Sequence, residues 1–255
     1  LRQALIENGF DKNNDGKISQ GEIYNIDSLD LSNKNLTNIS GLEYSNGLFD
    51  LNLSNNNIAD FIPLYNSKEL TFLNISGNNI SNIEFIKNFE MAKNGMTIFE
   101  EDNIKLYLTL DLSNNKISSI SSLYGLHFDS LDLSNYYISN ISVASDLFPN
   151  NSFSEIMFDI SNNFINIADG SSNKTLINDL INNGINVIYE PQNINNIIGV
   201  EDGKKYNTDI TITILQGSAT LNNIAISSET IVKDEGNYTI KFTDNGITRT
   251  INFEI

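Results

Sequence analysis

The sequence predicts an α/β solenoid of short parallel strands, with a small helical cap before it and a small all-β sandwich after it. Three observations predict this order. A segment close to LDLSNNxI recurs six times, oxygen-bearing residues are regularly spaced over residues 11–22, and strict apolar–polar alternation replaces the repeat from about residue 199. We therefore expect three regions, at residues 1–27, 28–196 and 197–255.

The composition excludes several kinds of function. The 255 residues include 15 basic and 32 acidic side chains, so the formal charge is −17, which disfavours a nucleic-acid partner because phosphate is bound by Lys and Arg. Cys and Trp are absent and His occurs once, which removes disulfides, thiolate metal sites and most histidine chemistry. No apolar run reaches the ~18 residues of a membrane-spanning helix, so we expect a soluble chain.

The first element is a loop whose spacing matches the calcium loop of an EF-hand. Oxygen-bearing residues occupy loop positions 1, 3, 5, 9 and 12, with Gly16 at position 6 and Ile18 at position 8. Ca²⁺ takes six to eight oxygen ligands. The expected ligands, with the carbonyl oxygen at position 7 and a water-bridged contact at position 9, are Asp11, Asn13, Asp15, Lys17, Ser19 and Glu22.

Two interpretations of this loop remain open. Its three carboxylates repel one another unless a cation is present, which favours a bound calcium ion. Alternatively, the loop has kept the shape and lost the metal. Regulatory calcium sensors use paired loops, and only one is present, so a structural calcium site is the better hypothesis.

The repeat follows the loop. Each copy opens with an apolar–polar–apolar triplet, and a further apolar residue follows at a fixed distance. One copy cannot bury its apolar face alone, so neighbouring copies must stack. The triplets are Leu29-Asp30-Leu31, Leu51-Asn52-Leu53, Leu73-Asn74-Ile75, Leu110-Asp111-Leu112, Leu131-Asp132-Leu133 and Phe158-Asp159-Ile160.

The pattern resembles the leucine-rich repeat family, and its 22-residue period is similar to that of the internalins of bacterial surfaces. The resemblance covers residues 28–190. It implies that the Asn three positions after the second strand Leu points inward and bonds backbone groups of adjacent turns. Asn56, Asn78, Asn115 and Asn163 hold that place, which explains part of the 43 Asn. Lys34 and Tyr136 interrupt the series, and Tyr136 is either a repacked turn or an exposed ligand contact.

Two intervals exceed the period. Residues 87–106 lengthen one repeat to 37 residues, and the interval from Leu131 to Phe158 is 27 residues. We expect both insertions to bulge from the convex or flanking side as a helix and loops. The acidic run Glu100-Glu101-Asp102 is interpreted as a solvated turn, and His127 as a loop residue.

Side chains beside the buried leucines should line a concave face in three columns. One column is Asp or Asn, one is Ser, and the third is varied. Two uniform columns either only solvate the sheet or take part in binding. We place partner contacts where the chain departs from its consensus, or along the acidic column as a selector of a basic partner surface. The candidate contact residues are Phe72, Asp111, Asp132, Tyr136, Tyr137 and Met157.

The array should close with a helix over residues 175–184, a strand over 185–189 and a polar joint over 191–196. Alternation at residues 210–214 and 238–242, with a turn signal at Asp244-Asn245-Gly246-Ile247, predicts an antiparallel sandwich. This segment resembles a bacterial immunoglobulin-like domain, and Asp234 to Tyr238 matches the spacing of a tyrosine corner.

Two functions are compatible with these elements. The resemblance implies a monomeric, non-enzymatic bacterial surface or secreted protein that binds a protein or other macromolecule on a host or cell surface, with calcium in its cap. The alternative is a cell-wall-associated protein that binds or processes glycans with the concave Asp column. Glycosidases need two carboxylates in unlike environments, whereas the column offers similar ones, so we prefer the first.

Overall fold

The computed structural model describes residues 1–100, 103–150, 152, 155–167, 169–192, 197–214, 217–227, 229–244 and 247–255. The chain divides into two compact units. The first consists of Leu1–Asn163 and Ile167–Gln192, and the second of Phe164–Asn166 and Asn193–Ile255.

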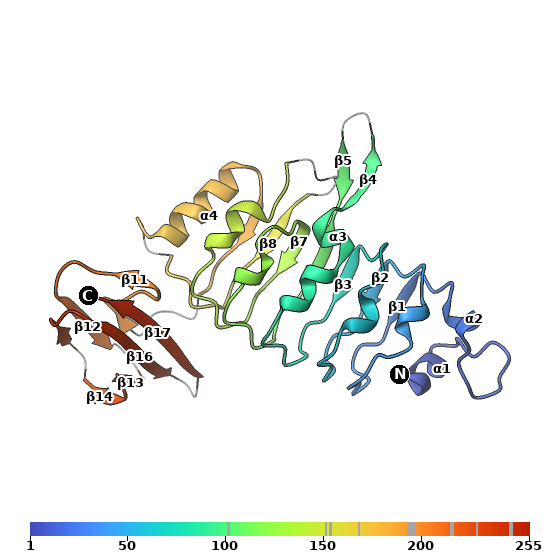
Figure 1. Cartoon of the computed structure of the whole chain (residues 1–255), viewed down its shortest axis with the longest axis horizontal. Helices are drawn as coiled ribbons and strands as arrows, with labels where there is room; N and C mark the ends of the chain where they lie inside the picture. Colours follow the sequence, from blue (N-terminus) through green and yellow to red (C-terminus); the bar gives the residue numbers. More distant parts are fainter. Residues whose placement is uncertain are drawn as a thin grey trace. The chain divides into compact units, whose positions relative to one another are not determined.

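A seven-stranded parallel sheet forms the body of the first unit (Figure 1). Six of its strands overlap the predicted triplets, and each of the six ends at the second residue of its triplet. The strands pair in register, so that Leu29, Leu51 and Leu73 lie side by side and the series continues to the last strand. The predicted solenoid of parallel strands is therefore confirmed. The strands are β1 (Ser28–Asp30), β2 (Asp50–Asn52), β3 (Phe72–Asn74), β6 (Leu108–Asp111), β7 (Phe128–Asp132), β8 (Met157–Asp159) and β9 (Asn186–Ile188).

Short 3₁₀ helices carry the chain back between strands. Each buries an apolar residue, such as Leu42, Leu64 or Leu123. In each strand the residue before the last one is apolar and is buried between two more exposed neighbours. The core of the unit therefore lies between one face of the sheet and this return path, and the other face of the sheet remains open. The helices are η1 (Leu42–Tyr44), η2 (Ile62–Leu64), η3 (Glu84–Asn88), η4 (Ser121–Leu123) and η5 (Ser142–Asp146).

The inward asparagines form the predicted ladder. The Asn115 Oδ1 accepts hydrogen bonds from the backbone nitrogens of Asn78 and Ile80, both at 2.9 Å, and its Nδ2 donates to the carbonyl oxygens of Ile75 and Leu112 at 3.0 and 2.7 Å. Each amide thereby links its own turn to the preceding one. Asn56, Asn78 and Asn163 make the same kind of contact.

A second use of asparagine was not anticipated. The residue before the ladder position has a left-handed backbone, with φ between 55° and 64°, in all six repeats. Asn and Gly tolerate this region better than other residues. The Asn surplus therefore has two structural causes. The left-handed residues are Asn33, Asn55, Gly77, Asn114, Asn135 and Asn162.

The ladder is interrupted at Tyr136 and extended at Gln192. Tyr136 is 2% exposed, so the prediction that it contacts a partner is wrong, and of the two interpretations the repacked turn is correct. Gln192 was assigned to a polar joint, but its Nε2 donates to the carbonyl oxygen of Ile160 at 2.9 Å. A glutamine thus continues the ladder one step past Asn163.

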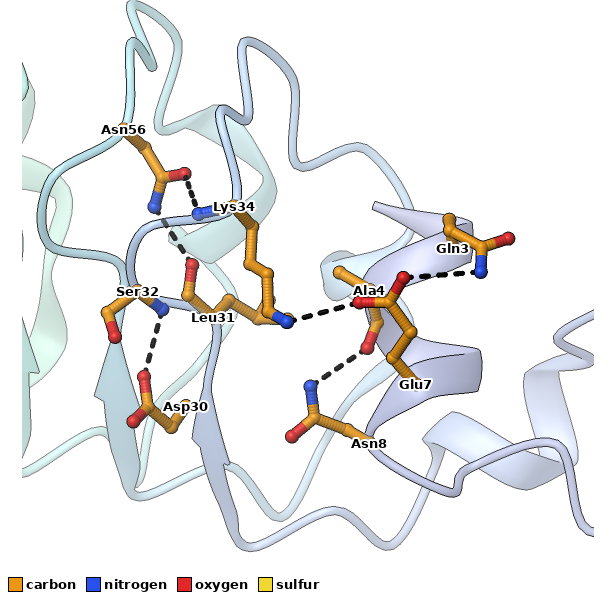
Figure 2. A network of polar contacts seen from close by, with 9 residues as sticks. All are labelled: Gln3, Ala4, Glu7, Asn8, Asp30, Leu31, Ser32, Lys34 and Asn56. Atoms are coloured by element: carbon orange, nitrogen blue, oxygen red, sulfur yellow. Dashed lines mark hydrogen bonds and ion pairs between the residues drawn. The ribbon is translucent and has the colours of Figure 1, made fainter.

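The N-terminal cap is α1 (Arg2–Glu7), the loop of residues 11–22, and α2 (Gln20–Ile23). Figure 2 shows how Lys34 joins this cap to the first repeat. Its backbone nitrogen donates to the Asn56 Oδ1 at 3.1 Å, and its Nζ forms an ion pair with Glu7 at 3.1 Å. Lys34 therefore replaces a ladder asparagine where the preceding turn is a helix.

The first insertion differs from its prediction. It contains α3 (Glu90–Lys93) as expected, but β4 (Met96–Phe99) and β5 (Ile104–Leu106) pair as an antiparallel hairpin, which projects from the body in Figure 1. The hairpin was missed because its strands have only four and three residues. Glu101 and Asp102 of the predicted acidic turn lie outside the described residues.

The two insertions meet beside β7. The carboxylate of the buried Asp129 accepts the backbone nitrogen of Tyr107, after the hairpin, at 2.9 Å. It also accepts the hydroxyl of Ser152, from the second insertion, at 2.6 Å. One buried acid thus ties together two segments that are far apart in the chain.

The repeat unit ends with α4 (Ser172–Asn182), which begins earlier than predicted because the Ser171 hydroxyl accepts the backbone nitrogen of Lys174 as an N-cap. Strand β9 follows it, close to the predicted range. Of the predicted polar joint, residues 193–196 lie outside the described residues.

The second unit holds two sheets whose inward residues, among them Ile212, Ile240 and Phe253, form one apolar core. The Tyr238 hydroxyl donates to the carbonyl of Asp234 at 2.8 Å, the bond expected of a tyrosine corner. Asn245 and Gly246 of the predicted turn lie outside the described residues. The strands are β10 (Ile197–Ile198), β12 (Ile210–Ile214) and β15 (Thr230–Val232) in one sheet, and β11 (Lys204–Lys205), β17 (Ile247–Glu254), β16 (Asn237–Asp244), β13 (Ser218–Leu221) and β14 (Ile224–Ile226) in the other.

Candidate functional site

The open face of the seven-stranded sheet presents the varied column. Strand pairing places these residues side by side, and two of them, Phe72 and Met157, are large apolar side chains that are each 37% exposed. They lie three strands apart, on β3 and β8. The column consists of Ser28, Asp50, Phe72, Thr109, Ser130, Met157 and Asn186.

The Asp and Asn column ends the strands. In every repeat the side-chain oxygen accepts a hydrogen bond from the backbone nitrogen of the Ser two residues later, at 2.8 to 3.0 Å. This local bond turns the chain out of the strand. The column is Asp30, Asn52, Asn74, Asp111, Asp132 and Asp159, and Ile188 occupies its place on β9.

The serine column does not line this face, so that prediction is wrong. Five of its members are only 6–9% exposed, namely Ser54, Ser76, Ser113, Ser134 and Ser161. The prediction extended strand alternation past the end of each strand. The bond from the Ser nitrogen to the Asp or Asn side chain has already turned the chain there, and the hydroxyl is buried.

The acidic residues of the strand-end column are Asp30 at one end of the sheet and three neighbours towards the other end. Asp111, Asp132 and Asp159 lie on three consecutive strands, whereas Asn52 and Asn74 occupy the two strands before them. Burial raises the pKa of Asp132, and the neighbouring charges of Asp111 and Asp159 raise it further. The structure therefore brings Asp111 and Asp132 together, as predicted, and adds Asp159.

The two candidate tyrosines differ. Burial raises the pKa of Tyr136, whose hydroxyl lies next to Asn115 without a hydrogen bond of its own. Tyr137 is half-buried, and its backbone nitrogen donates to the carbonyl of Ile117 at 3.1 Å. Tyr137 therefore remains a candidate contact.

One residue of the open face was missed. Ile188 is 39% exposed and lies beside Asp159. Extending the triplet pattern to Val187, the buried centre of β9, would have placed Ile188 in this column.

The predicted calcium loop is closed by its own carboxylates. The two carboxylate oxygens of Asp11 accept the backbone nitrogens of Asp15 and Gly16 at 3.1 and 2.9 Å, and the Glu22 Oε1 accepts the backbone nitrogen of Lys12 at 2.8 Å. Gly16, at the sixth position, has the left-handed φ of 75° that a sharp turn needs. The acidic side chains therefore point into the loop, where a bound ion would also lie.

The Glu22 carboxylate accepts hydrogen bonds from three residues of this loop, Lys12, Asn13 and Ser19. Its Oε2 accepts the backbone nitrogen and the hydroxyl of Ser19, both at 2.8 Å, and these bonds lower the pKa of Glu22 to about 2. Among the described residues no three Asp, Glu, His or Cys side chains gather as closely as metal ligands do. The types of ligand residue and their order thus fit calcium. To bind the ion with both carboxylate oxygens, Glu22 would have to give up its hydrogen bonds to backbone N–H groups.

Comparison with known proteins shows the fold. No protein-family model matches the chain, and no curated protein matches it. The structure is similar to internalin C2 of Listeria monocytogenes, with 26% identity, 75% of each chain covered and a TM-score of 0.53. The chain is therefore internalin-like in its leucine-rich repeat architecture.

Two further internalins of Listeria monocytogenes match more weakly. For InlF the identity is 23%, 64% of this chain and 51% of the other are covered, and the TM-score is 0.45. For the functional domain of InlJ the values are 15%, 93%, 59% and 0.36. Within the described residues, no helix is long and apolar enough to span a membrane.

Proposed function

We propose that this chain is a non-enzymatic bacterial protein, secreted or displayed on the cell surface, that binds a protein or other macromolecule on a host or cell surface through the open face of its repeats. The observation that carries the proposal is the varied column, where Phe72 and Met157 remain exposed on a face whose other positions are fixed by hydrogen bonds. The structural likeness to internalin C2 supports it.

The physical argument concerns which positions the fold leaves free. The Asp and Asn column ends the strands and the serines are buried, so the repeat itself requires both. The varied column carries no such task, and large apolar side chains exposed to water there cost free energy unless a partner covers them. Aromatic and Met side chains are common anchors of protein interfaces.

The experiment compares surface proteins captured from host cells by the intact chain and by the Phe72→Ala/Met157→Ala variant. We expect the double variant to lose at least about tenfold in affinity. The control is Tyr124→Ala, because Tyr124 is 72% exposed but follows η4 on the return path. Equal capture by both variants and the intact chain would place the binding surface elsewhere.

We also propose that the loop of residues 11–22 binds one calcium ion that stabilises the N-terminal cap. Asp11, Asn13, Asp15 and Glu22 would supply side-chain oxygens, Lys17 its carbonyl, and Ser19 a contact through water. The bound ion would neutralise carboxylates that otherwise repel one another. The alternative remains a loop that its own hydrogen bonds hold closed without a metal.

Calorimetric titration with CaCl₂ tests this proposal. We expect one ion per chain and a rise in the melting temperature that EDTA reverses. Glu22→Gln should weaken binding more than tenfold, while Asp60→Asn, outside the loop, should leave it unchanged. The absence of binding at millimolar calcium would establish the metal-free alternative.

Glycan processing is the second candidate, and one observation favours it. Burial raises the pKa of Asp132, which lies beside Asp111, and a carboxyl group with a raised pKa can serve as the general acid of a glycosidase. Turnover of peptidoglycan or simple polysaccharides that is lost in Asp132→Asn would make the chain an enzyme. Without such turnover the binding function stands.

A further inference from the structure

The negative charge at the strand ends is not needed by the fold. Asn52 and Asn74 make the strand-ending bond to the next Ser nitrogen at 3.0 Å, and Asp111, Asp132 and Asp159 make the same bond at 2.8 to 2.9 Å. Only an acceptor oxygen is required, and a neutral amide supplies it. The chain nevertheless carries carboxylates on three consecutive strands.

Those carboxylates oppose one another. Neighbouring strands are about 4.8 Å apart, so each carboxylate faces a like charge at close range. The side chains are half-buried, which weakens the screening by water. The part of the chain that the structure describes contains four ion pairs, and none of them includes Asp111, Asp132 or Asp159.

We infer that Asp111, Asp132 and Asp159, with Met157 and Ile188 beside them, form a docking surface for a basic helical segment of a partner protein. The inference rests on the proposed binding function and specifies its partner. Charges that the fold does not need, that repel one another and that form no ion pair among the described residues are stabilised when a partner supplies the cations.

The spacing of the column favours a helix. Three neighbouring strands set the outer carboxylates about 9.6 Å apart. Basic side chains one turn apart on a helix repeat about every 5.4 Å, so three of them span about 10.8 Å, whereas three alternate residues of an extended strand span about 13 Å. Lys or Arg residues on one helical face therefore match the column more closely than an extended peptide does.

Apolar contacts lie on both sides of the charges. Met157 precedes Asp159 by two residues on the same face of β8, and Ile188 is beside Asp159 on β9. Both are more than a third exposed. An amphipathic helix would bury them with its apolar residues while its cations meet the carboxylates.

The test uses two labelled peptides of equal length and equal charge, whose binding to the full chain is measured by fluorescence anisotropy. One is an alanine-based helix with three lysines on one face, and the other is kept extended by prolines. We expect the helical peptide to bind more tightly and to lose affinity when NaCl rises from about 50 to 500 mM. The triple variant Asp111→Asn/Asp132→Asn/Asp159→Asn should bind it at least about tenfold more weakly.

A matched control removes three charges elsewhere. Asp60→Asn/Asp146→Asn/Asp179→Asn changes exposed residues outside the column, and it should alter affinity by less than about twofold. If both triple variants lose the same affinity for the helical peptide, the effect depends only on net charge and the inference is overturned. Preference for the extended peptide would overturn the helical geometry.

Capture from host cells separates this inference from the proposed function. If the Phe72→Ala/Met157→Ala variant loses capture while the triple Asn variant retains it at every salt concentration, the face binds a partner but the acidic docking surface is wrong. If the triple Asn variant also loses the captured protein, and that protein contains a basic helix that competes with the peptide, the inference is supported.

Discussion

Replacing Asn115 by Ala should be among the most damaging single changes in the repeat unit. Asn115 is 6% exposed, and its side chain bonds two backbone nitrogens and two backbone oxygens at 3.0 Å or less. Alanine would leave these groups in the interior with no water to replace the amide. The nitrogens of Asn78 and Ile80 lose the side-chain oxygen to which they donate.

The size of the loss follows from those groups. A buried donor or acceptor left unpaired costs about 1–3 kcal/mol, and carbonyl oxygens tolerate the loss better than nitrogens. Two nitrogens at about 1.5 kcal/mol and the Leu112 oxygen at about 0.5 kcal/mol give about 3.5 kcal/mol, since the Ile75 oxygen still accepts the Asn78 Nδ2 at 3.1 Å. Because domains are stable by about 5–15 kcal/mol, the variant should be close to unfolding at 37 °C.

Urea denaturation followed by circular dichroism measures this loss. The matched control is Asn57→Ala, one position past the ladder, where the exposed side chain makes one long contact with Asn79 at 3.5 Å. That control should lose less than about 0.5 kcal/mol. A loss below about 1 kcal/mol for Asn115→Ala would show that the ladder does not hold the turns together.

Four further outcomes are expected. Gly95→Ala should cost more than about 2 kcal/mol, because the added Cβ would lie 2.8 Å from a tyrosine ring at a φ of 61°, whereas Gly125→Ala, with open space and a φ of 77°, should cost about 1 kcal/mol in the same urea assay. Tyr136→Phe should raise the melting temperature slightly, since it removes a buried hydroxyl that lacks a partner. Burial raises the pKa of Asp132 above 3.8, so ionisation of this carboxyl group destabilises the folded state as pH rises. At pH 7 the Asp132→Asn variant should therefore be more stable than the intact chain. This difference in unfolding free energy should vanish below about pH 3.8. The pKa of Glu22 is lowered from 4.5 to about 2, so its bonds stabilise the cap above pH 4.5 and are lost as pH falls towards 2, and Glu22→Gln should flatten that part of the stability profile.

The repeat could be predicted because its period reports the stacking directly. Leu29, Leu51 and Leu73 are separated by one period and lie in register, so spacing in the chain becomes position in the sheet. The positions of the ladder asparagines could be predicted from the same repeat period. Lys34 interrupts the series in the first repeat, and its ion pair with Glu7 shows what replaces a ladder neighbour there.

The other predictions were wrong because they depended on local hydrogen bonds and tertiary contacts, which the repeat period does not reveal. The Ser column was misplaced because the side chain of Asp or Asn ends each strand, which periodicity does not report. Tyr136 occupies a ladder position whose burial depends on the neighbouring turns. Gln192 was missed because it lies 29 residues after Asn163, beyond a helix that breaks the period.

Asp can replace Asn at one position of each repeat but not at another, and this difference has an evolutionary consequence. In the ladder the amide both accepts and donates, so a carboxylate cannot replace it. At the strand ends only the acceptor is used, so Asn52 and Asp132 perform the same local task. Single Asn–Asp exchanges at the strand ends can therefore change the charge of the open face during evolution, while the solenoid beneath it stays the same.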